Sequence, residues 1–388
     1  MQHLKLTAPS ALRSHRMSSL HRQRGMTLIE LMISMTIGLI LLAALTVLIV
    51  QQSSTQAELE KSSRQIENGR YAMYLLNEDV QMAGYYGEFS GTIAVPGPVP
   101  VAVPGALPDP CLTTASALEA AMVFPVQGYD FPNASTVRPS CIAAANHVSG
   151  TDILVVRRVE PATSTLAVAA AAAGGQVYLQ SGLTTSGLEF NKKLGTGADA
   201  AGTSVFTLLN KDGTTASLRK FVVRIYFVSP CSVMSGTACT SADDGGKPIP
   251  TLKMLELSAS GGATTLSTTP LVEGIENLQI DYGIDTTGDG SPDGQFLSTP
   301  PLYPSPSVSV VPRWADTVAL RMHLLARNNE SSAGYVDPKT YAMGYNSAAA
   351  VQTVAPVTDT YGNNVRPYKR HVFSQLIRIV NPSSRRDQ

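Results

Sequence analysis

The chain has 388 residues, 29 basic and 29 acidic side chains, 44% hydrophobic residues and four cysteines. A net charge of zero argues against a nucleic-acid-binding protein, which would show a basic face to hold phosphates. The length is sufficient for a sizeable hydrophobic core, so the sequence predicts a globular protein that does not bind nucleic acid.

The first 25 residues form a basic leader without acidic side chains, and it ends at Gly25. Its basic residues are Lys5, Arg13, Arg16, Arg22 and Arg24. Positive charge beside an apolar segment stays on the cytoplasmic side of a membrane. We therefore expect the leader to remain cytoplasmic and the chain after Val50 to face outward.

An uncharged run follows from 31 to 57, with a single carboxylate, Glu30, at its start. Its apolar part, 31–50, would form roughly 30 Å of helix, which is enough to cross a bilayer. An ordinary secretory signal is the alternative, but it has a shorter apolar core of about 7–15 residues and a small-residue cleavage site. The sequence therefore predicts a membrane helix. A carboxylate at the edge of hydrocarbon costs free energy unless it finds a partner, and such a pair sets register more than it stabilises.

The stretch Arg22-Gln-Arg-Gly25-Met26-Thr-Leu-Ile-Glu30 resembles the class III signal of type IV prepilins and pseudopilins. The resemblance implies that a prepilin peptidase cuts between Gly25 and Met26 and that the new N-terminus is methylated. Glu30 would then be the fifth mature residue, which in this family pairs with the terminal amine of a neighbouring subunit. Met26 stands where Phe is usual, at a position that tolerates other apolar residues.

We predict that the helix covers 26–87, with Gly84 and Gly87 as terminators. One face should pack on a sheet, because apolar and small residues recur at helical spacing. These residues are Leu59, Ser62, Ile66, Gly69, Met73, Leu76, Val80 and Ala83. The segment from Asn68 to Tyr85 (NGRYAMYLLNEDVQMAGY) also resembles the end of this helix in PilW-type minor pilins.

The remainder, 88–388, should be a β-rich head with proline-rich loops. Six prolines within 96–110 predict an extended surface loop, and 298–312 predicts another connector. Strands are expected at 151–160, 175–179, 204–209, 220–228, 252–257, 275–282, 317–326 and 368–380. The stretch 167–175 is read as a loop or a helical turn, 328–365 as a polar insertion, and the C-terminus as a polar tail.

Two later blocks extend the resemblance to PilW-type proteins: Leu271-Val-Glu-Gly-Ile-Glu-Asn-Leu-Gln-Ile-Asp-Tyr282-Gly and Tyr368-Lys-Arg-His-Val-Phe373. The stretch 90–215 resembles no family. The resemblance implies an α+β, type IV pilin-like fold, in which a long N-terminal α-helix packs on a mainly antiparallel β-sheet head.

The four cysteines are expected on the exported side, where disulfides persist. Of the three ways to pair them we favour the sequence-local one, Cys111 with Cys141 and Cys231 with Cys239. A zinc site is the weaker interpretation, because the cysteines form no CxxC motif and have no pair of histidines nearby.

One segment has the spacing of a calcium loop. Asp285, Thr287, Asp289, Ser291 and Asp293 place oxygen atoms at every second position, with Gly290 sixth. The twelfth position is Phe296, so the closing Glu of that motif is missing. The favoured alternative is an Asp/Gly-rich turn whose side chains make local hydrogen bonds. No motif of a hydrolase, metalloprotease or nucleotide-binding enzyme is present, so we expect no enzyme and no cofactor other than this calcium candidate.

The resemblance implies a minor pilin that primes type IV pilus assembly and sits at the fibre tip, supporting adhesion and twitching motility. Its partners would be other minor pilins, the major pilin, the prepilin peptidase and a tip adhesin. It would wait in the bacterial inner membrane, with its head in the periplasm, and then enter the pilus on the cell surface. Two other roles stay open at this point: a pseudopilin of a type II secretion system, and a tip adhesin that binds a surface receptor directly.

Overall fold

The computed structural model describes residues 25–89, 104–131, 136–172, 174–186, 190–201, 205–302, 311–346 and 348–386. Most of the leader and parts of both proline-rich loops lie outside these ranges. The chain divides into two compact units, residues 1–57 and 58–388. The division coincides with the end of the uncharged run, since Glu58 is the first charged residue after Glu30.

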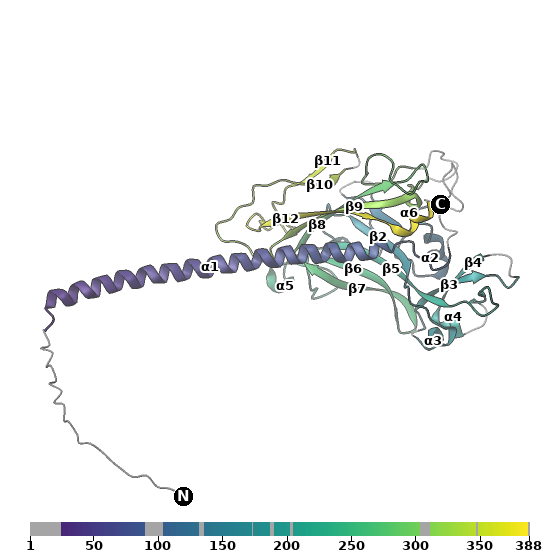
Figure 1. Ribbon diagram of the computed structural model, residues 1–388, viewed down its shortest axis with the longest axis horizontal. Coiled ribbons are helices and arrows are strands. Elements are labelled where there is room, and N and C mark those ends of the chain that lie inside the picture. Colours follow the sequence, from purple (N-terminus) through teal and green to yellow (C-terminus); the bar gives the residue numbers. More distant parts are fainter. Residues whose placement is uncertain are drawn as a thin grey trace, which may run out of the picture. The chain divides into compact units, whose positions relative to one another are not determined.

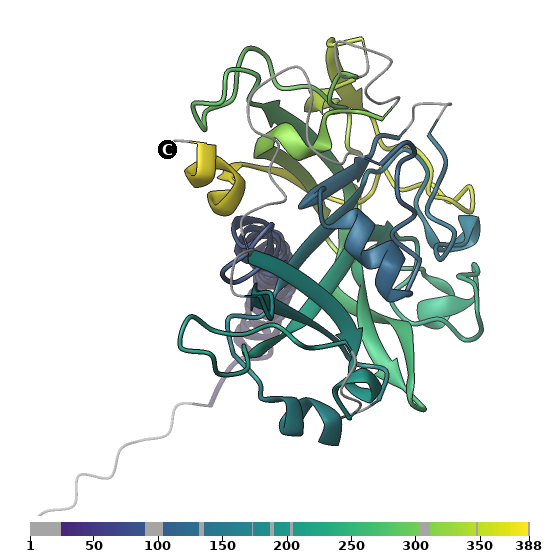
Figure 2. The same ribbon diagram turned by 90° about the vertical axis from the view of Figure 1, so that its right-hand side faces the viewer.

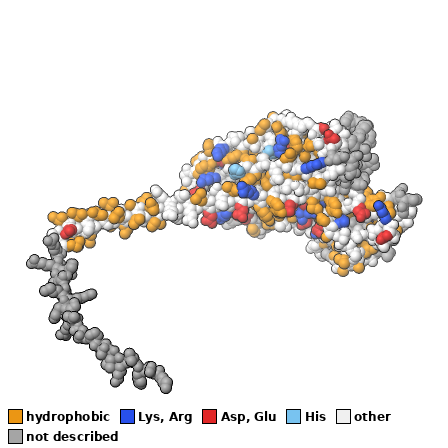
Figure 3. Space-filling view, in the orientation of Figure 1, with side chains coloured by type: hydrophobic (Ala, Val, Ile, Leu, Met, Phe, Trp, Pro, Cys, Tyr) orange, Lys and Arg blue, Asp and Glu red, His pale blue; other side chains and the backbone are white. Residues whose placement is uncertain are grey.

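The long helix α1 (Leu28–Gln81) has 54 residues. By length and composition it is able to cross a membrane, and its apolar side chains from Leu28 to Val50 are exposed. Hydrophobic side chains cover most of the visible face of this part (Figure 3). The helix ends six residues before the predicted limit, and the chain leaves it through a turn in which Gly84 has φ +73°. A positive φ suits glycine, which explains the stop.

The head combines antiparallel strands with short helices around the C-terminal half of α1 (Figure 1, Figure 2). Its helices are α2 (Ala115–Ala121), α3 (Leu166–Ala171), α4 (Gly197–Ala201), α5 (Asp243–Gly246) and α6 (Val380–Arg386), with 3-10 turns at Ala144–Asn146 and Trp314–Asp316. Its strands are β1 (Val126–Tyr129), β2 (Ile153–Val159), β3 (Val177–Leu183), β4 (Phe190–Thr196), β5 (Leu218–Ser229), β6 (Thr251–Ser260), β7 (Ala263–Glu273), β8 (Ile275–Ile284), β9 (Thr317–Arg327), β10 (Tyr341–Tyr345), β11 (Val351–Val354) and β12 (Arg370–Arg378).

The strands form three sheets, and every pairing is antiparallel. The largest has the order β1-β2-β5-β3-β4, with β6 joined to β5 and β7 joined to β6. The second has the order β12-β9-β8, and the third is the pair β10-β11. The α+β, pilin-like layout predicted from the sequence is therefore confirmed: one long apolar helix followed by antiparallel sheets.

The C-terminal half of α1 packs against the three-stranded sheet and part of the large one. Its buried residues are Gln65, Gly69, Ala72, Met73, Leu76, Asp79 and Val80. Gly69 fits because the ring of Phe373 on β12 occupies the place where a Cβ would lie. The predicted face was wrong at Leu59 and Ile66, whose side chains are 67% and 38% exposed.

Most predicted strands are present, and the described residues form five others that were not predicted. β2, β3, β5, β6, β8, β9 and β12 overlap the predicted ranges. Within 205–209 the chain makes only isolated bridges, at Leu209. The unpredicted strands are β1, β4, β7 and the β10-β11 pair, the last of which lies inside the supposed polar insertion. The polar C-terminal tail forms the helix α6.

Both predicted disulfides are present. Cys111 is bonded to Cys141 and Cys231 to Cys239. Within the described residues no cysteine is free, so the thiols that a zinc site would need are all used.

Candidate functional site

The N-terminal motif lies at the start of α1. Gly25 and Met26 precede the helix, and Thr27 caps it: its side-chain oxygen accepts the backbone N–H of Glu30 at 3.3 Å, and its carbonyl accepts that of Leu31 at 3.1 Å. Satisfying these N–H groups fixes where the helix begins. Our sequence reasoning missed Thr27, although the pattern Thr-x-x-Glu is a known signal for a helix start.

Glu30 is exposed on the first turn of the helix. Its carboxylate has no hydrogen bond or ion pair with any residue in the described part of the chain. A carboxylate beside such an apolar segment is costly to bury alone. Within the described residues the geometry therefore leaves the Glu30 carboxylate available for a cation.

A buried carboxylate fixes α1 on the large sheet. Asp79 is 3% exposed and accepts hydrogen bonds from Arg158 on β2 at 2.7 Å, from Arg224 on β5 at 3.0 Å and from the Tyr226 hydroxyl at 2.8 Å. Burial and the neighbouring Asp79 raise the pKa of Tyr226, which therefore stays a hydrogen-bond donor. These partners set both the rotation and the axial position of the helix on the sheet.

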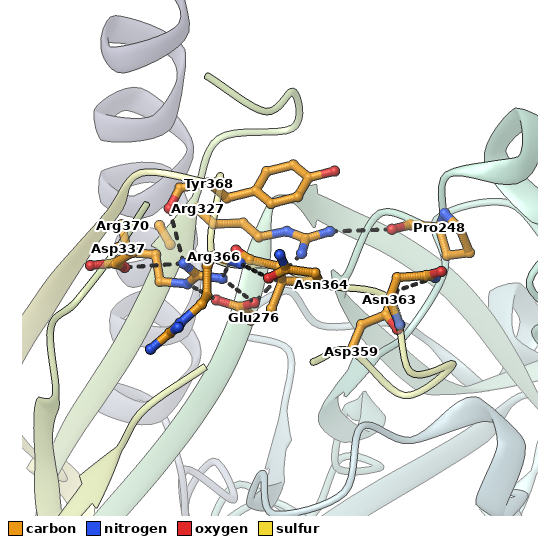
Figure 4. A network of polar contacts seen from close by, with 12 residues as sticks. Pro248, Glu276, Arg327, Asp337, Asp359, Asn363, Asn364, Arg366, Tyr368 and Arg370 are labelled. Carbon is orange, nitrogen blue, oxygen red and sulfur yellow. Dashed lines mark hydrogen bonds and ion pairs between the residues drawn. The ribbon is translucent and has the colours of Figure 1, made fainter. Parts of the chain in front are cut away.

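A second ionic network joins the two blocks on which the family resemblance rests. Arg370 on β12 binds both carboxylate oxygens of Glu276 on β8, and its Nη1 lies 3.0 Å from Asp337 (Figure 4). Arg327 on β9 lies between these strands, with Nη1 3.5 Å from Glu276 and its guanidinium over the ring of Tyr368. Planar two-point pairing of this kind is stronger and more directional than a single contact.

Glu58 lies on α1 at the start of the second unit, and its carboxylate links the helix to Lys369, which directly precedes the last strand, β12. Its carboxylate accepts from Lys369 at 2.7 Å, Ser332 at 2.6 Å and Lys61 at 3.2 Å. The hydrogen bonds from Lys369 and Ser332 lower the pKa of Glu58 to about 2. The helix is thus held by ionic contacts at both ends of its head-bound part.

A cavity of about 450 Å³ lies beside the second network. Its walls mix apolar and polar side chains, with Arg327, Glu276 and Asp359 as the charged residues that line it. The apolar wall includes Pro230, Pro248, Pro250, Val354, Pro356 and Val357. The size and lining suit a small ligand or a short peptide segment.

The calcium candidate forms a hydrogen-bonded turn. Asp285 is fully buried, and its carboxylate accepts the backbone N–H groups of Gly288 and Gly290. Asp293 accepts the N–H groups of Thr286 and Thr287, and these bonds lower its pKa.

The hydroxyl of Thr287 lies near both carboxylates, 3.5 Å from Asp285 and 3.3 Å from Asp293. Asp289, in contrast, is exposed, and its carboxylate accepts the backbone N–H of Ser291. Within the described ranges no three His, Cys, Asp or Glu residues are placed to hold a metal. Calcium binding stays a prediction, and the local bonds favour the turn.

Three strands bring together a serine, a histidine and an aspartate that sequence spacing could not connect. The hydroxyl of Ser374 lies 2.8 Å from Nδ1 of His323, and Nε2 of His323 lies 3.4 Å from Oδ2 of Asp281. Neither Nε2 nor Oδ2 has a hydrogen-bond partner among the described residues. The set therefore lacks the bond by which a buried carboxylate orients a catalytic histidine.

Two family models match the chain, one over the N-terminal motif and one over part of the head. Residues 20–46 match the family model of the prokaryotic N-terminal methylation motif, and residues 232–381 match that of Type IV Pilus-assembly protein W. No curated protein and no solved structure matches the chain. The second match contains β6 to β12, and with them Glu276, Arg327 and Arg370.

The chain therefore carries both a prepilin-type N-terminal methylation motif and a PilW domain, which together support a pilus-related minor pilin.

Proposed function

We propose that this chain is a minor pilin that joins other minor pilins in the complex that primes type IV pilus assembly and caps the fibre tip. In that position it supports adhesion and twitching motility. The observation that carries the proposal is the combination of an exposed apolar helix, the carboxylate of Glu30, which has no partner among the described residues, and a PilW domain in the head. A subunit built in this way can be stored in a membrane and later packed among similar helices.

The mechanism is mechanical and non-covalent. The prepilin peptidase cuts after Gly25 and methylates Met26, while the helix anchors the chain in the inner membrane with the head in the periplasm. The helix then moves laterally into the fibre, where helices of the major pilin and of other minor pilins replace lipid. Glu30 pairs there with the terminal amine of a neighbouring subunit, which sets the axial step.

Replacement of Glu30 tests this role. We expect Glu30→Ala to be processed at Gly25 at a normal rate, whereas the number of fibres per cell falls. Glu60→Ala is the matched control, because Glu60 is an exposed residue on the same helix whose carboxylate has no hydrogen bond or ion pair with the described residues. Normal piliation with Glu30→Ala, or a mature protein that does not begin at Met26, would refute the proposal.

The rival role in a type II secretion system uses the same N-terminal signal. The PilW match favours the pilus, since that model describes a pilus-assembly protein. Deletion of the gene should therefore abolish or reduce fibres and leave secreted enzymes unchanged. A loss of secretion with normal fibres would assign the chain to the secretion system.

Direct receptor binding at the tip is a second candidate role, and the 450 Å³ cavity is the observation that favours it. Filling the cavity with Val357→Trp should leave fibre number unchanged and reduce attachment if the head itself binds a surface. Val351→Trp, on the exposed strand β11, is the control. Equal attachment by both variants would restrict the head to an assembly role.

A further inference from the structure

Strand β7 has an open edge. Along one side it pairs with β6 over its whole length, from Ala263 to Glu273. On the other side, the Thr264 hydroxyl reaches the carbonyl of Gly175, but no described residue hydrogen-bonds to the backbone between Thr265 and Pro270. A row of unpaired N–H and C=O groups is a template for another strand.

This edge lacks the charged side chains that commonly protect an edge strand against pairing. No charged residue occurs between Leu257 and Val272, and Ser267 to Pro270 are exposed on both faces of the strand. Natural edge strands are commonly protected by charges, above all by lysine. The other long edge of the same sheet, β4, carries Lys192 and Lys193. Only Pro270, which has no N–H, limits the open row of β7.

We propose that β7 pairs with β7 of a second copy of this chain. The two strands run antiparallel about a two-fold axis near Ser267 and Thr268, so that the large sheets of two heads become continuous. Such an interface uses the same patch on both partners. A neutral edge meets its own copy without repulsion, and facing Thr and Ser side chains form favourable cross-strand pairs.

The location of β7 permits this contact. The strand lies along the lower margin of the head in Figure 1. Six residues of pairing bury much less than the roughly 1,200 Å² of a stable interface. We therefore expect the contact where the α1 anchor concentrates the chain, in the membrane before assembly.

Cysteine cross-linking of the full-length chain in membranes tests the pairing. All four native cysteines are in disulfides, so an introduced cysteine is the one free thiol. Under mild oxidation, Ser267→Cys or Thr268→Cys should form a dimer about tenfold faster than Lys193→Cys, an exposed position on β4, because pairing raises the local thiol concentration. Equal rates at β7 and β4 would overturn the proposal.

Charge reversal supplies a second measurement that does not depend on folding defects. In the Ser267→Cys background, Thr268→Lys alone and Thr268→Glu alone should each suppress the dimer, whereas coexpression of the two should restore it. Failure of the mixture to recover dimer would refute self-pairing. A cross-link from β7 to a different pilin instead would assign the edge to a strand of another subunit. Because the dimer is scored before fibre formation, this result is independent of the proposed pilus role.

Discussion

Asp79, in the last turns of α1, accepts a 2.7 Å hydrogen bond from Nε of Arg158 on β2, and both side chains are almost fully buried. The pair links the helix to a strand 79 residues further along the chain. A buried charge pair is costly to break on one side only, because the remaining charge stays buried without compensation.

Asp79→Ala should therefore lower the free energy of unfolding by about 3–5 kcal/mol. Glu78→Ala is the matched control, since Glu78 is exposed and its carboxylate bonds, among the described residues, only the hydroxyl of Tyr74 one turn away. Urea unfolding of the detergent-solubilised protein, followed by tyrosine and tryptophan fluorescence, measures both variants. Equal losses for the two would contradict the anchoring role of Asp79.

His147 should make the head sensitive to acid. It is 2% exposed, and burial together with Arg138 lowers its pKa from 6.5 to about 4. Between pH 6.5 and about 4 the imidazole of His147 is protonated in the unfolded chain but neutral in the folded chain. The free energy of unfolding therefore declines as the pH falls toward 4, by up to about 3 kcal/mol. Buried Asp152 has a raised pKa and acts with the opposite sign.

A comparison of variants isolates the histidine. His147→Gln should show a flatter stability profile between pH 6.5 and 4 than the unmodified chain. His371→Gln, which alters an exposed histidine on β12, should keep the original slope. Melting temperatures measured across this pH range would refute the assignment if all three profiles were parallel.

The two disulfides should differ in their contribution. The cysteines of one are 30 residues apart and those of the other 8. In the chain-entropy model the longer loop restricts the unfolded state more, by about 1 kcal/mol. Replacing Cys111 and Cys141 with serine should therefore destabilise the head more than replacing Cys231 and Cys239. The reverse order in denaturant titrations would show that native contacts outweigh loop length.

The Asp285 turn should hold without a cation. Asp285→Ala leaves the buried N–H groups of Gly288 and Gly290 unsatisfied and should cost about 2–3 kcal/mol. Asp289→Ala, at an exposed position in the same turn, should have a small effect. The melting temperature should be the same in calcium and in chelator. A calcium-dependent rise, with heat released on titration, would instead establish the predicted calcium site.

Ser374 should be chemically inert. Its histidine neighbour is not polarised by a hydrogen bond to Asp281, because that contact is 3.4 Å long and fails as a hydrogen bond. A fluorophosphonate probe should therefore label the chain and Ser374→Ala equally weakly. Selective labelling that disappears in the variant would reveal an unexpected nucleophile.

Sequence patterns correctly predicted the helices and strands that are determined by residues within one short stretch. The uncharged run gave the long helix, and the β-branched and aromatic residues of 220–228 gave β5. The cysteine pairing followed from proximity in sequence. The cap at Thr27 was equally readable and was overlooked.

Long-range partners explain what the sequence did not predict. Gln65 is buried because its amide reaches the carbonyl of Ala326, and Asp79 is buried because arginines from two strands meet it. Neither polar residue belongs to an apolar stripe, so both were left out of the predicted helix face, although Gly69, Met73, Leu76 and Val80 were placed on it correctly. β7 was not predicted because its Thr and Ser residues and Pro270 do not form the pattern of apolar residues that indicates a strand. It is a strand because it pairs with β6.

Residues of β12 and α6 contact the head-bound part of α1 and the turn that follows it. Asn381 of α6 donates to the carbonyls of Met82 and Ala83, where α1 ends, and Phe373 fills the space over Gly69. Deletion of β12 and α6 would remove these contacts and uncover the part of α1 beneath them. The head-bound part of α1 therefore depends on a segment about 300 residues further along the chain.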